Sequence, residues 1–195
     1  EHIIMKLLTG LFLTFLVAAT VSSDSSNTLM IGNSGEPATL DPHKYNLRLE
    51  ETLLNDLFLG LTTFNADGEI VAGAAESWET SADGLTWRFF LREDLKWSDG
   101  KNLTAEDFVY SFRRLLNPQT AASLSYFLYM IKNAEQVNNA QKAVSSLGVY
   151  SDGPNILVIE LDRPYPYLLE RLLYPTGFPV PKHVIESVGS NWVQP

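Results

Sequence analysis

The chain has 195 residues, no cysteine and a formal net charge of −9. Without cysteine it can form no disulfide, thiol nucleophile, cysteine-ligated metal site or lipid-modified cysteine. Its 14 Lys and Arg residues are scattered among 23 Asp and Glu residues, which excludes the clustered positive charge that nucleic-acid binding requires and favours neutral ligands or basic partners.

The first residues predict export. Residues 1–4 precede a plausible initiator, Met5, and are treated as upstream sequence without structural meaning. Residues 5–26 have the form of a cleaved signal peptide, with an apolar run from Leu7 to Ala19 between a basic residue and small residues. The run is shorter than the roughly 20 residues of a membrane-spanning helix. A buried core helix fits less well, because no periodic sequence follows the run.

The next segments are expected to form a strand, a loop and a helix. Leu29–Gly32 is a short apolar run typical of a buried strand, and residues 36–44 form a loop that contains two prolines. From Arg48 to Leu61, leucines and a phenylalanine recur at helical spacing. Two glutamates in the first turn favour the helix N-terminus there.

Three evenly spaced Asp-Gly pairs predict tight turns, because glycine adopts positive φ freely and aspartate tolerates it. They are Asp67-Gly68, Asp83-Gly84 and Asp99-Gly100. After the second pair, Leu85–Arg92 alternates apolar and polar residues, which indicates a strand with one buried face. We expect successive strands of a meander, and we attribute the spacing to turn chemistry rather than to a sequence repeat.

Helices surround a second strand in the remaining sequence. Thr104 can cap a helix that ends at Asn117-Pro118, where the proline stops it. Residues 121–141 are compatible with a helix, Leu157–Leu161 alternates as a strand, and Pro164–Tyr174 predicts another short helix. The expected fold class is α+β with a mostly antiparallel sheet.

The block from Ala75 to Ser111 resembles the family 5 solute-binding proteins of ABC importers. So many matches at fixed spacing are hard to obtain by chance. Residues 40–44, 179–183 and 192–195 are similar to the oligopeptide-binding branch in particular. The residues of the block that match the family pattern are Ala75, Trp78, Glu79, Asp83, Gly84, Thr86, Trp87, Phe89, Leu91, Arg92, Lys96, Trp97, Ser98, Asp99, Gly100, Thr104, Ala105, Asp107, Phe108, Val109, Tyr110 and Ser111.

The resemblance implies a fold and a domain order. It implies a periplasmic-binding-protein type II-like lobe with an inserted subdomain of mostly antiparallel sheet and helix. By analogy, residues 27–59 start the ligand-binding lobe, residues 60–181 form the inserted small subdomain, and residues 182–195 return into the lobe. Because such proteins are several times longer, we interpret the lobe as incomplete and the chain as an amino-terminal fragment.

The same resemblance implies a function. Such proteins are periplasmic oligopeptide-binding components that hold extended peptides by backbone hydrogen bonds and deliver them to the membrane subunits of an ABC permease. A monomer without enzymatic activity or cofactor is expected. Within the family, the solute could instead be a dipeptide, a murein peptide, an oligosaccharide or a nickel chelate. From other classes, an exported hydrolase or an adhesion module stays open, although no nucleophile elbow, phosphate loop or calcium loop occurs.

Two places match ligand-contacting positions of the family. One segment would lie along the peptide and pair with its backbone, although it can also be interpreted as an ordinary loop entering a helix. It consists of Tyr45, Asn46, Leu47 and Arg48. Leu124 matches a position that is commonly aromatic in oligopeptide binders, and Tyr126 or Tyr129 could compensate. Residues 32–34 (Gly32, Asn33 and Ser34) are weaker candidates.

Other polar and aromatic residues are expected to be structural. Asp41 and His43 resemble a catalytic pair, but Asp before Pro favours a turn, so they are expected to cap and brace their loop. His43 and His183 lie too far apart in the sequence to predict a metal site. The tryptophans are expected to fill the subdomain core, with their N–H groups paired locally. These are Trp78, Trp87 and Trp97.

Overall fold

The computed structural model describes residues 31–193. Its contacts divide the chain into two units, residues 1–32 and 33–195, and all helices and strands of the described part belong to the second unit. The second unit is not divided further, so the expected boundaries of an inserted subdomain at residues 60 and 181 stay a prediction.

Most predictions for the first 32 residues fall outside the described part of the chain, and only the end of the predicted strand can be compared with the structure. The upstream residues 1–4 and the signal peptide at residues 5–26 lie outside the described residues, as does the first half of the strand expected at Leu29–Gly32. Its last two residues form no strand. The Ile31 side chain is 74% exposed, so that part of the strand prediction is wrong.

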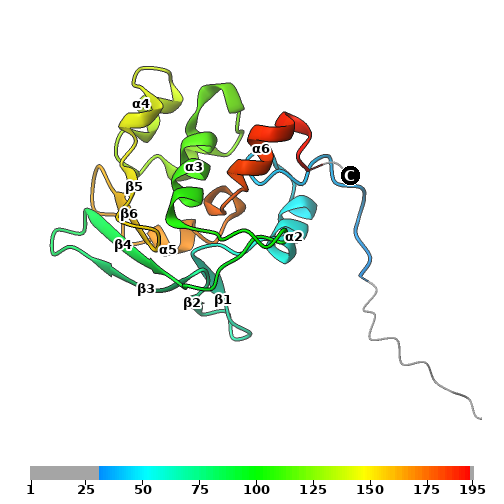
Figure 1. Cartoon of the computed structure of the whole chain (residues 1–195), viewed down its shortest axis with the longest axis horizontal. Helices are drawn as coiled ribbons and strands as arrows, with labels where there is room; N and C mark the ends of the chain where they lie inside the picture. Colours follow the sequence, from blue (N-terminus) through cyan, green and yellow to red (C-terminus); the bar gives the residue numbers. More distant parts are fainter. Residues whose placement is uncertain (1–30, 194–195) are drawn as a thin grey trace, which may run out of the picture. The chain divides into compact units, whose positions relative to one another are not determined.

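Helices and strands follow one another along the second unit (Figure 1). The α-helices are α2 (Arg48–Leu57), α3 (Ala105–Leu116), α4 (Ala134–Asn138), α5 (Leu168–Arg171) and α6 (Lys182–Val188). The strands are β1 (Thr62–Phe64), β2 (Ile70–Ala72), β3 (Ala75–Thr80), β4 (Thr86–Leu91), β5 (Val149–Ser151) and β6 (Ile156–Glu160). The 3₁₀ turns are η1 (Pro118–Thr120), η2 (Ser125–Leu128), η3 (Val144–Ser146), η4 (Pro175–Gly177) and η5 (Gly189–Asn191).

The strands form two antiparallel sheets. β1 and β2 make a hairpin, and a separate four-stranded sheet has the order β3-β4-β6-β5. Gly68 and Gly84 turn the β1-β2 and β3-β4 hairpins with positive φ values of 80° and 70°, a conformation that glycine adopts without steric cost. The α+β prediction is confirmed, and β4 and β6 correspond to the strands predicted at Leu85–Arg92 and Leu157–Leu161.

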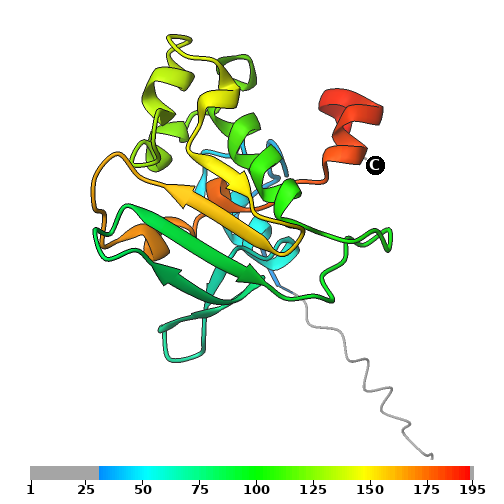
Figure 2. The same ribbon diagram turned by 60° about the vertical axis from the view of Figure 1, so that its left-hand side comes forward.

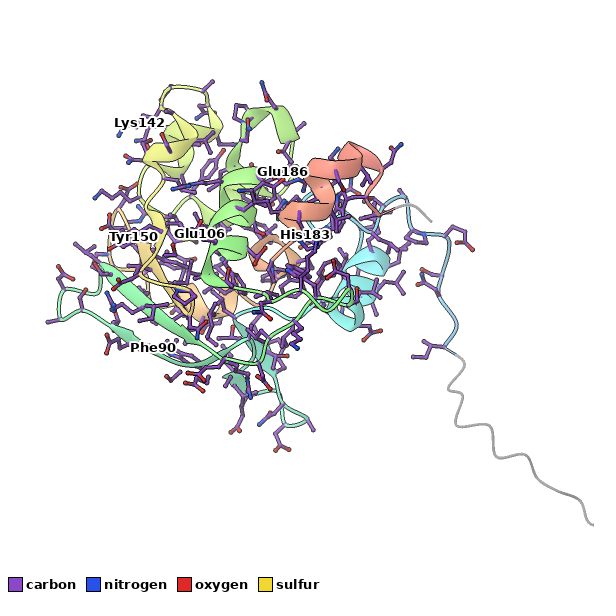
Figure 3. The ribbon with its side chains drawn as sticks, in the orientation of Figure 1. Phe90, Glu106, Lys142, Tyr150, His183 and Glu186 are labelled. Atoms are coloured by element: carbon purple, nitrogen blue, oxygen red, sulfur yellow. The ribbon has the colours of Figure 1, made fainter. Side chains whose placement is uncertain are left out.

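The third Asp-Gly pair has a different role from the one expected. Asp99-Gly100 does not lead into a further strand of the sheet, because β4 pairs next with β6 and the turn closes only an isolated bridge between Lys96 and Asn102. The turn instead contacts α6. His183, labelled in Figure 3, places Nε2 2.7 Å from Asp99 Oδ2. The predicted meander is therefore wrong beyond β4.

The core lies between α3 and the four-stranded sheet (Figure 2). α3 packs against β5 and β6, and its Phe108, Phe112 and Leu115 are fully buried in one cluster with Phe89 of β4. Burial of each such side chain stabilises the fold by about 1.5–3 kcal/mol. These side chains therefore attach the helix firmly to the sheet.

The ends of α3 follow the predicted capping chemistry. The Asp107 carboxylate accepts hydrogen bonds from the Thr104 backbone N–H at 2.9 Å and from its hydroxyl at 3.3 Å, as in a capping box. At the other end, Asn117 is extended, as expected before proline. The predicted helix and both of its ends are confirmed.

Three other helix predictions need correction. α2 stops at Leu57 because Phe58 is extended, so it is shorter than predicted. The helix expected over residues 121–141 is divided into η2 and α4, because Asn133 adopts a left-handed φ of 65° between them. The helix expected over Pro164–Tyr174 is reduced to α5.

The tryptophan prediction is half right. Trp78 and Trp87 are half-buried and pack against the core. However, the indole N–H groups of Trp87 and Trp97 are buried without a hydrogen-bond partner among residues 31–193, so the predicted local pairing is wrong for these two.

Among residues 31–193, no helix is long and apolar enough to cross a membrane.

Candidate functional site

One carboxylate shapes the loop that precedes α2. Glu50 Oε1 accepts the backbone N–H of Ala38 at 2.9 Å, and Oε2 accepts those of Asn46 at 3.0 Å and Leu47 at 3.2 Å. Burial raises the pKa of Glu50, but these backbone donors lower it more, so the net pKa lies below its ordinary value. Glu50 stands three residues after Leu47, where a capping box places its acid. That spacing could have revealed this role.

A second network attaches the same loop to α3. The Arg114 guanidinium binds Asp41 in a bidentate pair of 2.6 and 3.0 Å, and Trp192 Nε1 donates to Asp41 Oδ2 at 3.3 Å. Burial raises the pKa of Asp41, but Arg114 and His43 lower it more. Asp41 also accepts the His43 backbone N–H. The expectation that Asp41 braces its loop is confirmed.

His43 is neutral in this network. Arg114 Nη1 lies 2.7 Å from His43 Nδ1, and because arginine can only donate, Nδ1 must accept and Nε2 must carry the proton. Burial and the Arg114 charge lower the pKa of His43 to about 3. Since Asp41 is engaged with Arg114, the two residues form a structural pair rather than a catalytic one.

The four residues of the expected peptide-contacting segment differ in their exposure. The Tyr45 side chain is only 3% exposed, whereas Asn46, Leu47 and Arg48 are exposed. Glu50 already occupies the N–H groups of Asn46 and Leu47, and the Leu47 carbonyl accepts from α2. Within the described residues, the Asn46 carbonyl and the Arg48 N–H have no partner. These two groups are available to a ligand.

Leu124 lies close to the contact between η2 and η4. It precedes η2 and is half-buried, and both η2 and α2 pack on η4. Of the two tyrosines that could compensate for it, Tyr129 donates its hydroxyl to Asn138. Tyr126 is 55% exposed, so Tyr126 is the one with a surface to offer.

An aromatic cluster joins these segments. Phe127 contacts Tyr126 and Tyr174 edge-on, with ring centroids 4.9 and 5.2 Å apart. The Tyr45 hydroxyl is buried without a partner in the described part of the chain. Burial, followed by the charges of Glu51, Tyr174 and Tyr126, raises its pKa.

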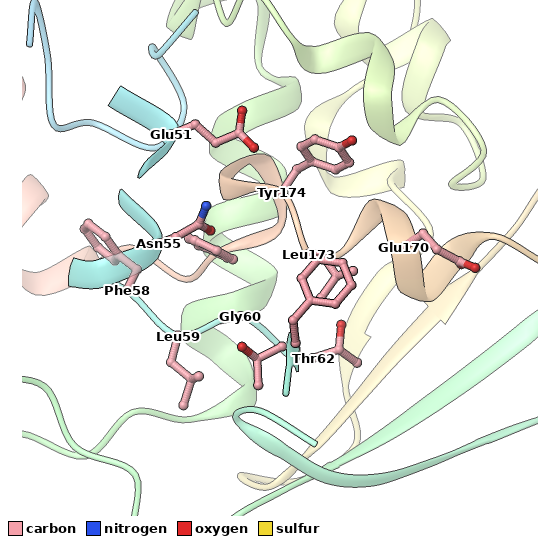
Figure 4. Close-up of a pocket in the computed structure, with 12 residues that line it drawn as sticks. Glu51, Asn55, Phe58, Leu59, Gly60, Thr62, Glu170, Leu173 and Tyr174 are labelled. Atoms are coloured by element: carbon pink, nitrogen blue, oxygen red, sulfur yellow. The ribbon is translucent and has the colours of Figure 1, made fainter. Parts of the chain in front are cut away.

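A cavity of about 560 Å³ opens next to this cluster, between α2, β1, α5 and η4 (Figure 4). Glu51, Glu170 and Tyr174 are among its lining residues. Its size is typical of a small-molecule site. Glu170 could not be predicted as a site residue from the sequence, because it reaches the cavity from a distant segment.

Within the described residues, neither the weaker candidates at residues 32–34 nor a metal site is part of this cavity. Asn33 and Ser34 are exposed and bonded within their own turn, and the structure offers them no connection to the cavity. Among residues 31–193, no group of three or more His, Asp or Glu side chains could hold a metal ion.

Comparison with known proteins decides the family. Residues 69–193 match the model described as bacterial extracellular solute-binding proteins, family 5 Middle. The chain belongs to this family.

Three relatives illustrate the range of the likeness. The chain is 39% identical over 181 residues to the periplasmic oligopeptide-binding protein OppA of Escherichia coli (strain K12), covering 92% of the chain and 33% of OppA. It is 39% identical to the periplasmic murein peptide-binding protein MppA of the same strain, covering 82% of the chain and 30% of MppA. A crystal structure of Haemophilus influenzae OppA in complex with the peptide RPPGFSPFR matches with a TM-score of 0.81 and 37% identity, covering 83% and 32%.

These comparisons confirm the resemblance to the family 5 solute-binding proteins and the predicted periplasmic-binding-protein type II-like lobe. At this identity and TM-score, the fold of the chain is that of the corresponding part of OppA and MppA. The chain spans about a third of the length of the relatives that it matches.

Proposed function

We propose that the protein containing this chain is a periplasmic oligopeptide-binding component of an ABC importer. The observation that carries the proposal is the exposed Asn46–Arg48 segment, which is fixed by Glu50 and leaves one carbonyl and one N–H unpaired. On an extended segment, the carbonyl of one residue and the N–H of the residue two positions later face the same side. Both can therefore bond to one parallel or antiparallel peptide strand. The names of the relatives, OppA above all, support a peptide as the ligand.

The proposed mechanism is capture and delivery. The peptide is held mainly through its main chain, which gives affinity with little dependence on side chains. Two lobes close on it by a hinge motion, and the closed form is presented to the membrane permease. The proposed contacts are Tyr45, Asn46, Leu47, Arg48 and Leu124. The protein acts as a monomer without catalysis, and residues 60–181 serve as the inserted subdomain.

A single substitution tests the backbone contact. Arg48 is the first residue of α2, where proline is well tolerated, and Leu47 before it is already extended. Arg48→Pro therefore removes the N–H while keeping the helix. Arg48→Ala is the matched control, because it removes the side chain and keeps the N–H.

Calorimetry of the full-length protein with peptides of two to five residues gives the readout. We expect Arg48→Pro to bind a tripeptide about tenfold more weakly than Arg48→Ala does, which corresponds to the loss of one hydrogen bond. Equal affinities would remove the role of this N–H. Absence of binding to every linear peptide, with binding of a murein peptide or a nickel chelate, would assign the protein to another solute of the same family.

A further inference from the structure

The cavity between α2 and α5 carries negative charge at two of its edges. Glu51 lines it from α2 and Glu170 from α5, and in Figure 4 Tyr174 lies between them while the Glu170 carboxylate is at the outer rim and points outward. The other lining residues are neutral: Asn55, Phe58, Phe64 and Phe178 among them. No lysine, arginine or histidine of residues 31–193 lines the cavity.

Neither carboxylate is neutralised by a nearby base. In the described part of the chain, all ion pairs involve other residues. The sequence neighbour of Glu170, Arg171, points elsewhere: its guanidinium lies 5.2 Å from the Phe127 ring centroid, and its Nε donates to the Tyr165 hydroxyl at 3.2 Å. The cavity therefore has two uncompensated negative charges.

The remaining walls suit an organic cation with an aliphatic stem. Phe58, Phe64, Phe178 and Tyr174 present aromatic surface, which attracts ammonium and guanidinium groups and also covers methylene groups. A metal ion would find too few oxygen ligands here, but a lysine or arginine side chain matches both the charges and the apolar walls.

The cavity is also close to where the peptide would lie. Glu51 follows Arg48 by three residues on α2, so the two side chains share one face of the helix. A peptide paired with the Asn46 carbonyl and the Arg48 N–H would pass the mouth of the cavity, and a side chain on its near face could enter.

We propose that this cavity is a specificity pocket that accepts a lysine or arginine side chain of the bound peptide, with Glu51 and Glu170 as its counter-charges. The proposal rests on the proposed function, because it names which peptides that site prefers. It requires no change in the backbone contacts, so neutral peptides still bind, but more weakly.

The test compares peptides of equal size in the full-length protein. Calorimetry with Ala-Lys-Ala, Ala-Gln-Ala and Ala-Glu-Ala, and with the lysine moved to the first or third position, measures the preference directly. We expect at least one lysine peptide to bind about three- to tenfold more tightly than its glutamine counterpart, as two partly exposed ion pairs allow. Acidic peptides should bind most weakly.

Substitutions then locate the preference. The double variant Glu51→Gln with Glu170→Gln should bind the lysine and glutamine peptides equally. Glu76→Gln is the matched control, because Glu76 is an exposed carboxylate of β3 outside the cavity. It should leave the preference intact.

The outcomes separate the two proposals. Equal binding of lysine and glutamine peptides by the wild-type protein overturns the pocket while leaving peptide binding in place. If the double variant also unfolds at lower denaturant concentration, a basic residue from elsewhere in the full-length protein occupies the cavity instead. Binding of no peptide at all would count against the proposed function itself.

Discussion

Glu50 shows how much one side chain can decide at the residue scale. It is nearly inaccessible to solvent, and both of its oxygens accept backbone N–H groups of the loop that leads into α2. Hydrogen bonds to a charged acceptor are roughly twice as strong as neutral ones. The position of the Asn46–Arg48 segment therefore depends on this carboxylate.

Replacing Glu50 by glutamine should destabilise the protein by roughly 2 kcal/mol, because one acceptor oxygen becomes an NH₂ group that faces backbone donors. Urea denaturation of the full-length protein measures the loss. Glu51→Gln is the control, since Glu51 accepts none of these bonds, and it should change stability by less than about 0.5 kcal/mol. Equal stability of the two variants would refute the role of Glu50.

His43 should make the protein sensitive to mild acid. Its folded pKa of about 3 lies below the value of 6.5 for the unfolded chain. Between these pH values, the unfolded chain binds a proton that the folded chain does not, so stability falls as the pH drops. We expect a loss of roughly 2 kcal/mol between pH 6.5 and pH 5.

The matched variant for this effect is His43→Asn, which keeps an acceptor for Arg114 and cannot titrate. Its stability should change less over the same interval. Asp41 and Glu50, whose pKa values are lowered, affect stability mainly below their unfolded values near 4, so this pH range isolates the histidine. Parallel curves for wild type and variant would contradict the assignment.

Local residue chemistry was readable from the sequence, but long-range pairing was not. Asp41 before a proline predicts a braced loop, because its local hydrogen-bond partners, Thr39 and His43, lie only two residues away. Arg114, 73 residues away, carries no such signal, since an exposed helix position and a buried ion pair look the same in the sequence. For the same reason the sequence did not connect Glu170 with Glu51.

At the scale of elements, glycine positions decide which hairpins and contacts form. The Asp-Gly turns of β1-β2 and β3-β4 were predictable because the dipeptide itself fixes the turn. The break in the helix expected over residues 121–141 was not, since it depends on a left-handed asparagine, Asn133, rather than on glycine or proline. Propensity alone favours a continuous helix there.

Gly73 offers a direct test of close packing between elements. A Cβ atom on it would lie 2.5 Å from the Gly60 carbonyl oxygen and 3.0 Å from that of Leu61. Gly73→Ala should therefore destabilise the protein by about 1–3 kcal/mol in thermal unfolding. Gly35→Ala, where a Cβ meets no atom within 4 Å, should leave the melting temperature nearly unchanged. A neutral Gly73→Ala would mean that the strands can separate locally.

At the scale of the whole molecule, the second unit leaves apolar surface uncovered. A second cavity of about 510 Å³ is lined by Leu57, Leu59, Trp97 and Trp192, among others, and the first two are 61% and 45% exposed. Exposed apolar patches of this kind normally mark an interface. Because the relatives are about three times longer, we expect the rest of the protein to cover it.

Dye binding checks this expectation. Residues 33–195 expressed alone should bind a hydrophobic fluorescent dye more strongly than the full-length protein does, and Leu57→Lys with Leu59→Lys should reduce that signal. The same pair should destabilise the full-length protein, in which the surface is covered. Tyr150→Lys, at an exposed position outside both cavities, serves as the control. Equal dye binding by the two proteins would show that this surface stays open.

The contact between Trp192 and Asp41 spans 151 residues. A ribosome adds about 5–20 residues per second, so roughly 8–30 s pass between the synthesis of the two partners. During that interval the nascent loop has Glu50 within reach, but not its indole partner. The indole contact that helps to brace this loop therefore forms only after the far end of the described chain has been synthesised.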